Sequence, residues 1–487
     1  MEDAQSTIKP HAVMIPIHYQ GHVTPTINLA LKLASKGFTI TFVNTENIHH
    51  QITKSSPKKQ SKESEEDHDI DIDIFAGARS SGLDIRYKTI SDGFPLSYDR
   101  TRNSAEFNEA NLKVFPAHVD ELLGHLVQDD PSVSCLITDT FYTWTSRIAR
   151  KYNLVNISFW TQPALAFTLE YHLDLLVANG HFASNDTRVD TIDYIPGVKA
   201  LEPKDLTSFL QSTNTTSLAR RIIGTAFNDV KNADFILINA VQELENDTIS
   251  AIQEKQPFLA VGPIIPSGFT RGLVPTSLRT ASDCTNWLNT KPQGSVLYAS
   301  FGSSIQSRKS DIDEIAHGLV LSQVDFIWVL RPDAVSYEET YVLPDGFEER
   351  TENKGLVVPW CSQIEVLSHG AVGGFMTHCG WNSVLESLWC GVPLLCFPLL
   401  ADQPTNRKLV VDDWRTGVNL CDRQPLTRLE VAEKINRLMS GKSAEDLREE
   451  TFKVRQTLER ALATEGSSEK NLNQFISDVK AKISRLK

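Results

Sequence analysis

The chain has 487 residues, of which 41% are hydrophobic, and a formal net charge of −13. This length exceeds the roughly 250 to 300 residues at which one hydrophobic core stops growing, so we expect two domains. An acidic chain repels phosphates over most of its surface, which argues against nucleic acid or an anionic membrane as a partner.

The first ten residues are polar, and no apolar run approaches the roughly 20 residues that a membrane span requires. We therefore expect a cytoplasmic protein without a membrane anchor. Seven cysteines without a C-x-x-C pair predict neither a disulfide framework nor a zinc site. Nothing in the sequence indicates an obligate dimer, and we expect a monomer.

The first half alternates strand-length apolar runs with helical stretches. An apolar run at 11–17 precedes a loop, a helical stretch at 25–36 and a second strand-length run at 38–44. This order is the βαβ unit of a parallel sheet. The pattern recurs in apolar runs at 133–138, 155–160 and 233–239, with a helical stretch at 140–151. We expect a first domain over residues 1–260.

His22 follows the first of these runs, just before a helix that Thr24 could cap and Pro25 could open. Loops at the carboxyl ends of parallel strands line the ligand crevice of open α/β sheets. The positive end of a helix disfavours an imidazolium, so the ring would be neutral and able to accept a proton. Without further information, a surface or capping histidine is an equally good interpretation.

Two other features of the first half have simple structural interpretations. The charged segment 54–69 is almost free of apolar residues, and we expect a disordered loop there. The alternation of Asp and Ile from Asp69 to Ile74 could suggest metal binding, but it fits a half-exposed strand better, and we predict no metal. Asp139 follows a strand and precedes a helix, where an N-cap is the simplest role.

A stretch without periodicity, 261–282, reads as a linker. A second α/β series follows, with strand-length runs at 295–301, 326–330, 356–359, 373–377 and 393–399. We expect a second domain over residues 283–465. The final stretch, 466–487, looks helical and could pack back onto the first domain.

A block of 44 residues from Trp360 to Gln403 contains the parts of a nucleotide-sugar site. Within it, Thr377 to Ser383 lies between an apolar run and a helical stretch that stops at Gly391. The free N–H groups of such a helix start attract phosphates. Glu386 lies one turn further along the helix, within reach of ribose hydroxyls, and Trp360 offers a flat face for a base.

This block resembles the signature box of plant secondary-product UDP-glycosyltransferases. The resemblance implies the GT-B fold, an α/β architecture in which two Rossmann-like domains with parallel sheets face each other across a cleft. It also implies a metal-independent, inverting sugar transfer without a cofactor, in which the partners are a UDP-sugar, most simply UDP-glucose as co-substrate, and a small-molecule acceptor.

The resemblance assigns the residues of the donor site. Trp360 would stack on uracil, Gln363 would contact the nucleoside, and Glu386 would hold the ribose hydroxyls. Asp402 and Gln403 would bind the hydroxyls of the sugar. The other expected donor-site residues are His378, Trp381, Asn382 and Ser383 at the pyrophosphate, Gly302 and Ser303 in a turn near the phosphates, Thr161 at the sugar, and Cys361.

The family's catalytic base corresponds to His22, and its supporting aspartate corresponds to Asp139. In these roles His22 would deprotonate the acceptor, and Asp139 would orient the ring and stabilise its charged form, as in Ser-His-Asp triads. An acceptor pocket needs an apolar wall, for which the candidates are Phe94, Phe141, Trp144 and Tyr194.

Several alternatives remain open. The donor could be UDP-galactose, UDP-xylose or UDP-rhamnose, and the acceptor a flavonoid, terpenoid, hormone or simple phenol linked through oxygen, nitrogen or sulfur. A non-catalytic UDP-sugar sensor would keep the donor site without turnover. A sugar-nucleotide epimerase or dehydrogenase would carry G-x-G-x-x-G after its first strand, where this chain has a lone Gly21. A metal-dependent glycosyltransferase would use the Asp-Ile run.

Overall fold

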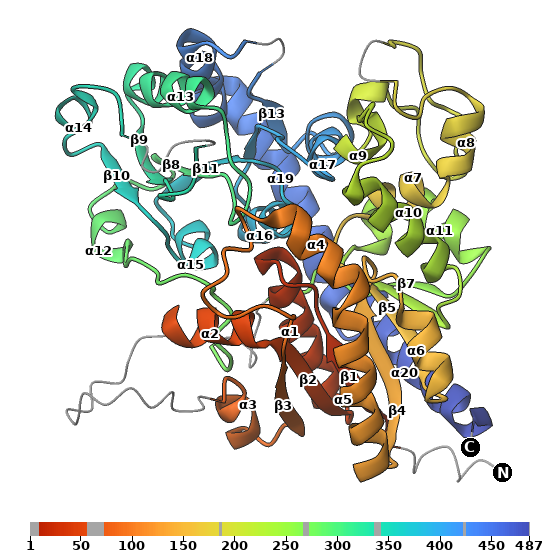
Figure 1. Cartoon of the computed structure of the whole chain (residues 1–487). Helices are drawn as coiled ribbons and strands as arrows, with labels where there is room; N and C mark the ends of the chain where they lie inside the picture. The colour runs from red at the N-terminus through yellow and green to blue at the C-terminus, as the bar shows by residue number, and fades with distance from the viewer. Residues whose placement is uncertain are drawn as a thin grey trace, which may run out of the picture.

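The computed structural model describes residues 9–55, 73–184, 188–265, 272–335, 342–421 and 425–486. Two parallel sheets organise these residues (Figure 1), with strand orders β3-β2-β1-β4-β5-β6-β7 and β10-β9-β8-β11-β12-β13. The first sheet comprises β1 (His11–Ile15), β2 (Thr39–Thr45), β3 (Ile85–Ile90), β4 (Val133–Asp139), β5 (Val155–Trp160), β6 (Phe235–Ile238) and β7 (Phe258–Ala260). The second comprises β8 (Val296–Ser300), β9 (Asp325–Val329), β10 (Gly355–Val358), β11 (Val372–Thr377), β12 (Leu394–Cys396) and β13 (Gly417–Asn419).

Helices cover both sheets (Figure 1). Those of the first half are α1 (Gln20–Ser35), α2 (Glu46–Ser55), α3 (Ala76–Ser80), α4 (Ser104–Lys113), α5 (Phe115–Asp129), α6 (Thr145–Lys151), α7 (Ala164–Tyr171), α8 (Leu173–Ala178), α9 (Ser208–Gln211), α10 (Leu218–Val230) and α11 (Asn246–Gln253), with short helices η1 (Pro203–Asp205) and η2 (Gln242–Leu244). Those of the second half are α12 (Thr285–Leu288), α13 (Lys309–Ser322), α14 (Phe347–Arg350), α15 (Gln363–Leu367), α16 (Trp381–Cys390), α17 (Gln403–Lys408), η4 (Leu409–Asp413), α18 (Arg428–Met439), α19 (Gly441–Leu462) and α20 (Ser467–Leu486).

The sheets confirm the predicted α/β fold of GT-B type. Their central strands are covered on both faces and are therefore rich in apolar residues, which is why the sequence pattern revealed them. In β1 and β4, for example, every residue is buried. The carboxyl ends of β1 and β4 lie side by side because these strands pair in parallel, with Ile15 opposite Thr138. The segments that follow the two strands are thereby brought together.

Two helix starts differ from the sequence prediction. The first helix begins at Gln20, not at residue 25, so Thr24 and Pro25 lie inside it and neither caps nor opens it. The helix after β4 begins at Thr145, not at residue 140. Asp139 therefore does not cap that helix.

The last helix, α20, packs on the first sheet although it follows the second half in sequence. Figure 1 shows it crossing beside β5 and β7. Its apolar side chains, Phe475 and Val479 among them, are fully buried in the same core as the side chains of β1, β2 and α1. The domain boundaries expected from the sequence, at 260, 282 and 465, stay predictions.

Other expectations fall partly or wholly outside the described residues. Of the charged segment 54–69, only Lys54 and Ser55 are described, and they end α2. A half-exposed strand was expected from Asp69 to Ile74. Residues 69–72 lie outside the described residues, and Asp73 and Ile74 are not in a strand. Across the described ranges, no helix has both the length and the apolar character needed to cross a bilayer.

Candidate active site

His22 and Asp139 meet at the carboxyl edge of the first sheet. His22 lies in the first turn of α1 and Asp139 is the last residue of β4. His22 Nδ1 is 2.6 Å from Asp139 Oδ2 and 3.0 Å from Thr161 Oγ1. A carboxylate can only accept, so Nδ1 carries the proton and Nε2 keeps its lone pair. The arrangement can therefore accept a proton at Nε2.

The Asp139 carboxylate is held by its own turn. Its side chain is 1% exposed, against 13% for His22. Its second oxygen, Oδ1, accepts the backbone N–H of Phe141 at 3.0 Å, which is the Asx-type turn that Asp commonly forms. This bond replaces the helix cap expected from the sequence, and it directs Oδ2 toward His22.

Helix α16 of the second half contacts α1, the helix that carries His22. Asn382, in the first turn of α16, donates its amide N–H to the Gly21 carbonyl at 2.7 Å. In an unbroken helix that carbonyl would accept from residue 25, but Pro25 has no N–H to donate. The Gly21 carbonyl is thus free to accept Asn382 from the other half. Asn382 also accepts from Asn239 Nδ2 at 3.4 Å.

His378 follows β11 and lies against two glycine backbones. A Cβ atom added at Gly302 or Gly380 would come within 2.5 Å of His378 Nε2. Gly302 also has φ +79°, a conformation that glycine adopts easily. The two glycines therefore make room for the imidazole, and Ser303 continues the Gly302 turn with its hydroxyl 3.2 Å from Ser304 Oγ.

His378 is neutral at physiological pH. Burial lowers its pKa to about 4, with the charge of Arg331 acting in the same direction and a backbone hydrogen bond to Ser300 opposing it. Its Nδ1 atom is buried and has no hydrogen-bond partner among the described residues. Buried polar atoms are rarely left unpaired, so this atom suits a ligand that enters beside the start of α16.

Gln363, Ser383 and Glu386 form one hydrogen-bonded group. Gln363 Nε2 donates to Glu386 Oε2 at 2.8 Å and to Ser383 Oγ at 3.0 Å. Burial raises the pKa of Glu386 to about 7, and the Gln363 hydrogen bond opposes that rise. Gly391, with φ +74°, ends α16 where the sequence predicted.

The three aromatic or sulfur-containing donor candidates are fixed by neighbours. Trp360 Nε1 donates to Ser277 Oγ at 3.0 Å, and the Arg279 guanidinium lies 5.9 Å from a Trp360 ring centroid. Cys361 is buried, with its thiol 3.6 Å from the Tyr298 hydroxyl. Trp381 Nε1 donates to the Asn239 carbonyl at 2.6 Å, so this indole holds the two halves together.

Asp402 and Gln403 lie at the start of α17. Asp402 is 7% exposed, and burial raises its pKa to about 6. The hydrogen bond that Asn406 donates to Asp402 Oδ2 opposes that rise. Gln403 Oε1 accepts the backbone N–H groups of Leu399 and Leu400, at 2.8 and 2.9 Å.

Of the four acceptor candidates, Phe141 lies beside His22, with ring centroids 5.8 Å apart. Phe94 stacks on Tyr98 at 4.2 Å. Trp144 is 4% exposed and packs on Tyr142, and the Tyr194 hydroxyl lies 2.9 Å from His181 Nδ1. The structure therefore brings Phe141 to the histidine but gives Trp144 the surroundings of a core residue.

Sequence reasoning missed Arg331 and Asn239. Arg331 is 3% exposed and donates to the carbonyls of Gly302 and Ile305, the latter at 2.7 Å. The sequence did offer one signal, an arginine two residues after the apolar run of β9, at the carboxyl edge of a strand where ligands bind in open α/β sheets. Asn239 follows β6 at the same sheet edge as Asp139.

The described residues contain no group of three or more side chains that could hold a metal ion. The start of α16 carries no side-chain cap on its backbone N–H groups, and the neutral His378 imidazole lies close by.

Comparison with known proteins agrees with this geometry. The family model for UDP-glucoronosyl and UDP-glucosyl transferases matches residues 263–447. UDP-glycosyltransferase 86A1 of Arabidopsis thaliana is 56% identical to this chain, over 99% of the chain and 97% of the relative.

Two solved structures have the same fold. A UDP-glucose: anthocyanidin 3-O-glucosyltransferase in complex with UDP has a TM-score of 0.81 and 26% identity, covering 99% of this chain and 100% of that one. Phytolacca americana UGT2, complexed with UDP-2fluoro-glucose and pterostilbene, has a TM-score of 0.75 and 26% identity, covering 96% and 99%. The chain belongs to the plant UDP-glycosyltransferase family and is a glycosyltransferase.

Proposed function

We propose that this enzyme transfers glucose from UDP-glucose, with inversion, to a hydroxyl group of a small lipophilic acceptor, giving a β-glucoside. The observation that carries the proposal is the 2.6 Å hydrogen bond between His22 Nδ1 and Asp139 Oδ2. A protein that only sensed a UDP-sugar would have no need for a base oriented by a buried carboxylate.

The reaction follows from the tautomer of His22. Nε2 takes the proton of the acceptor hydroxyl as the oxygen attacks the anomeric carbon of the sugar. The bond from that carbon to the β-phosphate oxygen breaks, and UDP leaves with the electron pair. The imidazolium that forms is stabilised by the Asp139 carboxylate, and attack from the face opposite UDP inverts the anomeric centre.

The leaving charge is neutralised by fixed dipoles in this proposal. The free N–H groups at the start of α16 attract the pyrophosphate. The neutral imidazole of His378 lies beside these groups and adds no charge to the site. We therefore propose that turnover needs no divalent cation.

Glucose is the favoured sugar because of Asp402 and Gln403. Gln403 uses its amide oxygen within its own loop, which leaves its amide nitrogen to donate to a sugar hydroxyl. The Asp402 carboxylate would accept from another hydroxyl. The anthocyanidin glucosyltransferase and the pterostilbene complex among the similar structures support a phenolic acceptor.

The acceptor would lie against the aromatic side chains around His22. Phe141 packs on Trp160 with ring centroids 5.2 Å apart, and the ring centroids of Tyr19 and His22 are 6.1 Å apart. These rings offer an apolar surface that would hold a flat acceptor with its hydroxyl directed at Nε2.

The test is UDP release from UDP-glucose in the presence of EDTA, with a pooled set of phenolic and terpenoid acceptors. We expect acceptor-dependent release by the wild type and a loss of about 100- to 10,000-fold in His22→Ala, the usual contribution of a general base. Release that required a divalent cation would contradict the metal-independent mechanism. Tight UDP-glucose binding without release for any acceptor would favour the sensor.

A further inference from the structure

The loop that presents Asp402 and Gln403 is held by the opposite half of the molecule. Ala401, the residue before Asp402, has φ +60°, which is unfavourable for a residue with a side chain. Its N–H donates to Ser208 Oγ at 2.8 Å, and its carbonyl accepts the Ser208 N–H at 2.8 Å. Ser208 thus satisfies both backbone groups of the strained residue.

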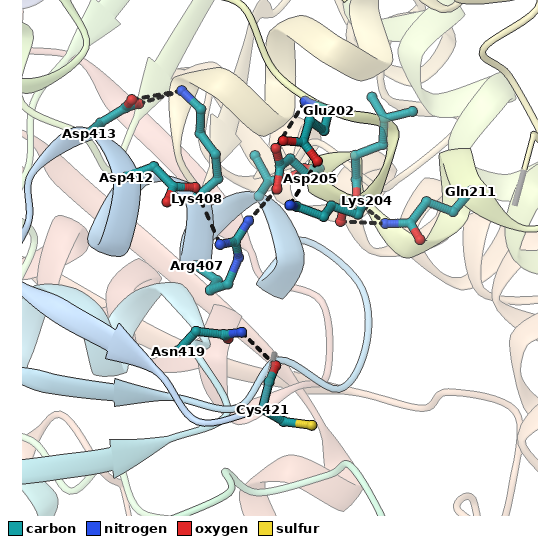
Figure 2. Close-up of polar contacts among 12 residues, drawn as sticks. Glu202, Lys204, Asp205, Gln211, Arg407, Lys408, Asp412, Asp413, Asn419 and Cys421 are labelled. Carbon is teal, nitrogen blue, oxygen red and sulfur yellow. Dashed lines mark hydrogen bonds and ion pairs between the residues drawn. The ribbon is translucent and has the colours of Figure 1, made fainter. Parts of the chain in front are cut away.

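A second anchor lies just beyond this loop, in α17. Thr405 Oγ1 donates to the Asp205 carbonyl at 2.7 Å. The Asp205 carboxylate also pairs with the Arg407 guanidinium, which contacts Asp412 at 3.3 Å on its other side. Figure 2 shows Arg407 between the two carboxylates. Asp205 is 5% exposed and Arg407 9%, so removing either partner would leave a buried charge unpaired.

The two anchors flank Asp402 and Gln403 in sequence. On the side of the second half, Gln403 Oε1 closes the turn through Leu399 and Leu400, and Asn406 donates to Asp402 Oδ2 at 2.7 Å. On the opposite side, contacts to 401, 405 and 407 all come from residues 205–208. The backbone position of the sugar-binding pair therefore depends on both halves.

We infer that Ser208 and Asp205 are positioning residues for the donor sugar: they belong to the first half and hold the Asp402 and Gln403 loop of the second half in its binding geometry. The inference rests on the proposed role of that loop. The nucleotide groups of the site, Trp360, Gln363 and Glu386, have no hydrogen bond to residues 205–208 among those the structure describes. The sugar part of the donor is thus sensitive to the anchors, and the UDP part is not.

The experiment compares binding of UDP with binding of a UDP-sugar, so that it needs neither an acceptor nor turnover. Calorimetry on the full-length protein first ranks UDP-glucose, UDP-galactose and UDP-xylose for the wild type. The sugar bound most tightly is then used with Ser208→Ala, Ser208→Thr and Asp205→Asn. We expect Ser208→Ala to weaken the UDP-sugar by about 5- to 10-fold, as for the loss of one hydrogen bond, and to change UDP binding by less than about twofold.

Ser208→Thr keeps the hydroxyl and should restore most of the UDP-sugar affinity, whereas Asp205→Asn should act in the same direction as Ser208→Ala. The matched control is Lys204→Ala. Lys204 lies on the same segment, but its side chain is exposed and its ammonium group pairs with Glu202 at 2.7 Å (Figure 2). We expect this control to bind both ligands like the wild type.

Two results would overturn the inference. If Ser208→Ala bound the UDP-sugar as tightly as the wild type, the loop would hold its geometry without the anchor. If UDP and the UDP-sugar weakened equally, the anchor would be merely structural. A wild type that binds the UDP-sugar but never releases UDP would contradict the proposed function alone, because the binding comparison would still stand.

Discussion

The proton on His22 is fixed by its two neighbours, Asp139 and Thr161. Since the carboxylate of Asp139 accepts at Nδ1, the lone pair lies on Nε2, and the ring is ready to act as a base without a change of tautomer. Thr161 shares the same Nδ1–H at 3.0 Å. The sequence resemblance had assigned Thr161 to the sugar, a role that stays a prediction, but its contact with His22 was not foreseen.

If Glu386 holds the ribose as proposed, we expect nucleotide binding to depend on pH. Its pKa is raised to about 7 by burial, so near neutral pH the empty site holds a mixture of acid and carboxylate. Ribose hydroxyls that donate to the carboxylate favour the ionised form, and UDP affinity should therefore fall as the pH is lowered through about 7. Calorimetric titration with UDP at a series of pH values, in steps of about half a unit from about 5.5 to about 8.5, measures how the UDP affinity changes with pH.

The matched variant is Glu386→Gln, which keeps the shape but cannot ionise. The phosphate of UDP titrates near 6 and contributes its own pH dependence, so only the difference between wild type and variant reports on Glu386. We expect the variant to lack the step near 7. Parallel pH profiles for the two proteins would show that Glu386 does not bind the ribose as a carboxylate.

At the scale of elements, the first turns of α1 do more than the sequence suggested. The pattern placed the helix start at Pro25, because proline is common in the first turn. The helix begins at Gln20, and Pro25 lies inside it. Because Pro25 has no N–H, the Gly21 carbonyl has no donor within α1 at residue 25, and the Asn382 side chain of α16 donates to it instead.

This arrangement predicts a coupling between Pro25 and Asn382. Asn382→Ala should destabilise the wild-type protein by about 1 to 3 kcal/mol, since the Gly21 carbonyl then lacks a partner. In the Pro25→Ala background the new N–H of residue 25 can bond to that carbonyl, and the same change should cost less. Urea unfolding of the four proteins without ligand gives the coupling energy. Strictly additive effects would show that Pro25 does not control the Gly21 carbonyl.

The strands that the sequence did not predict share one property. The strands β3, β7 and β13 each lie at the edge of a sheet, and β7 and β13 have only three residues. An edge strand is covered less completely than a central one, so β3 (IRYKTI) mixes exposed polar residues with buried ones and lacks an apolar run. The central strands were all predicted from their apolar runs, and so was β10, an edge strand whose sequence (GLVV) is itself an apolar run.

At the scale of the whole molecule, the sequence could not predict contacts between the halves. Most donor-site candidates came from the resemblance of one continuous block, and Thr161, Gly302 and Ser303 came from shorter matches to the same family, none of which needs knowledge of the fold. Asn239, Ser208 and Asp205 belong to the other half, and their contacts with Trp381, Ala401 and Arg407 depend on how the two sheets face each other. No local pattern encodes that placement.

The central claim is that a base in the first half acts on a donor held by the second. The measurement that tests it most directly is turnover and UDP-glucose binding of Asp139→Asn. An asparagine amide can donate to Nδ1, which would move the histidine proton to Nε2 and remove the base while keeping the geometry. We expect kcat to fall by about 100-fold or more with UDP-glucose affinity unchanged. A variant that kept wild-type kcat would contradict the assignment of His22 as the base oriented by Asp139.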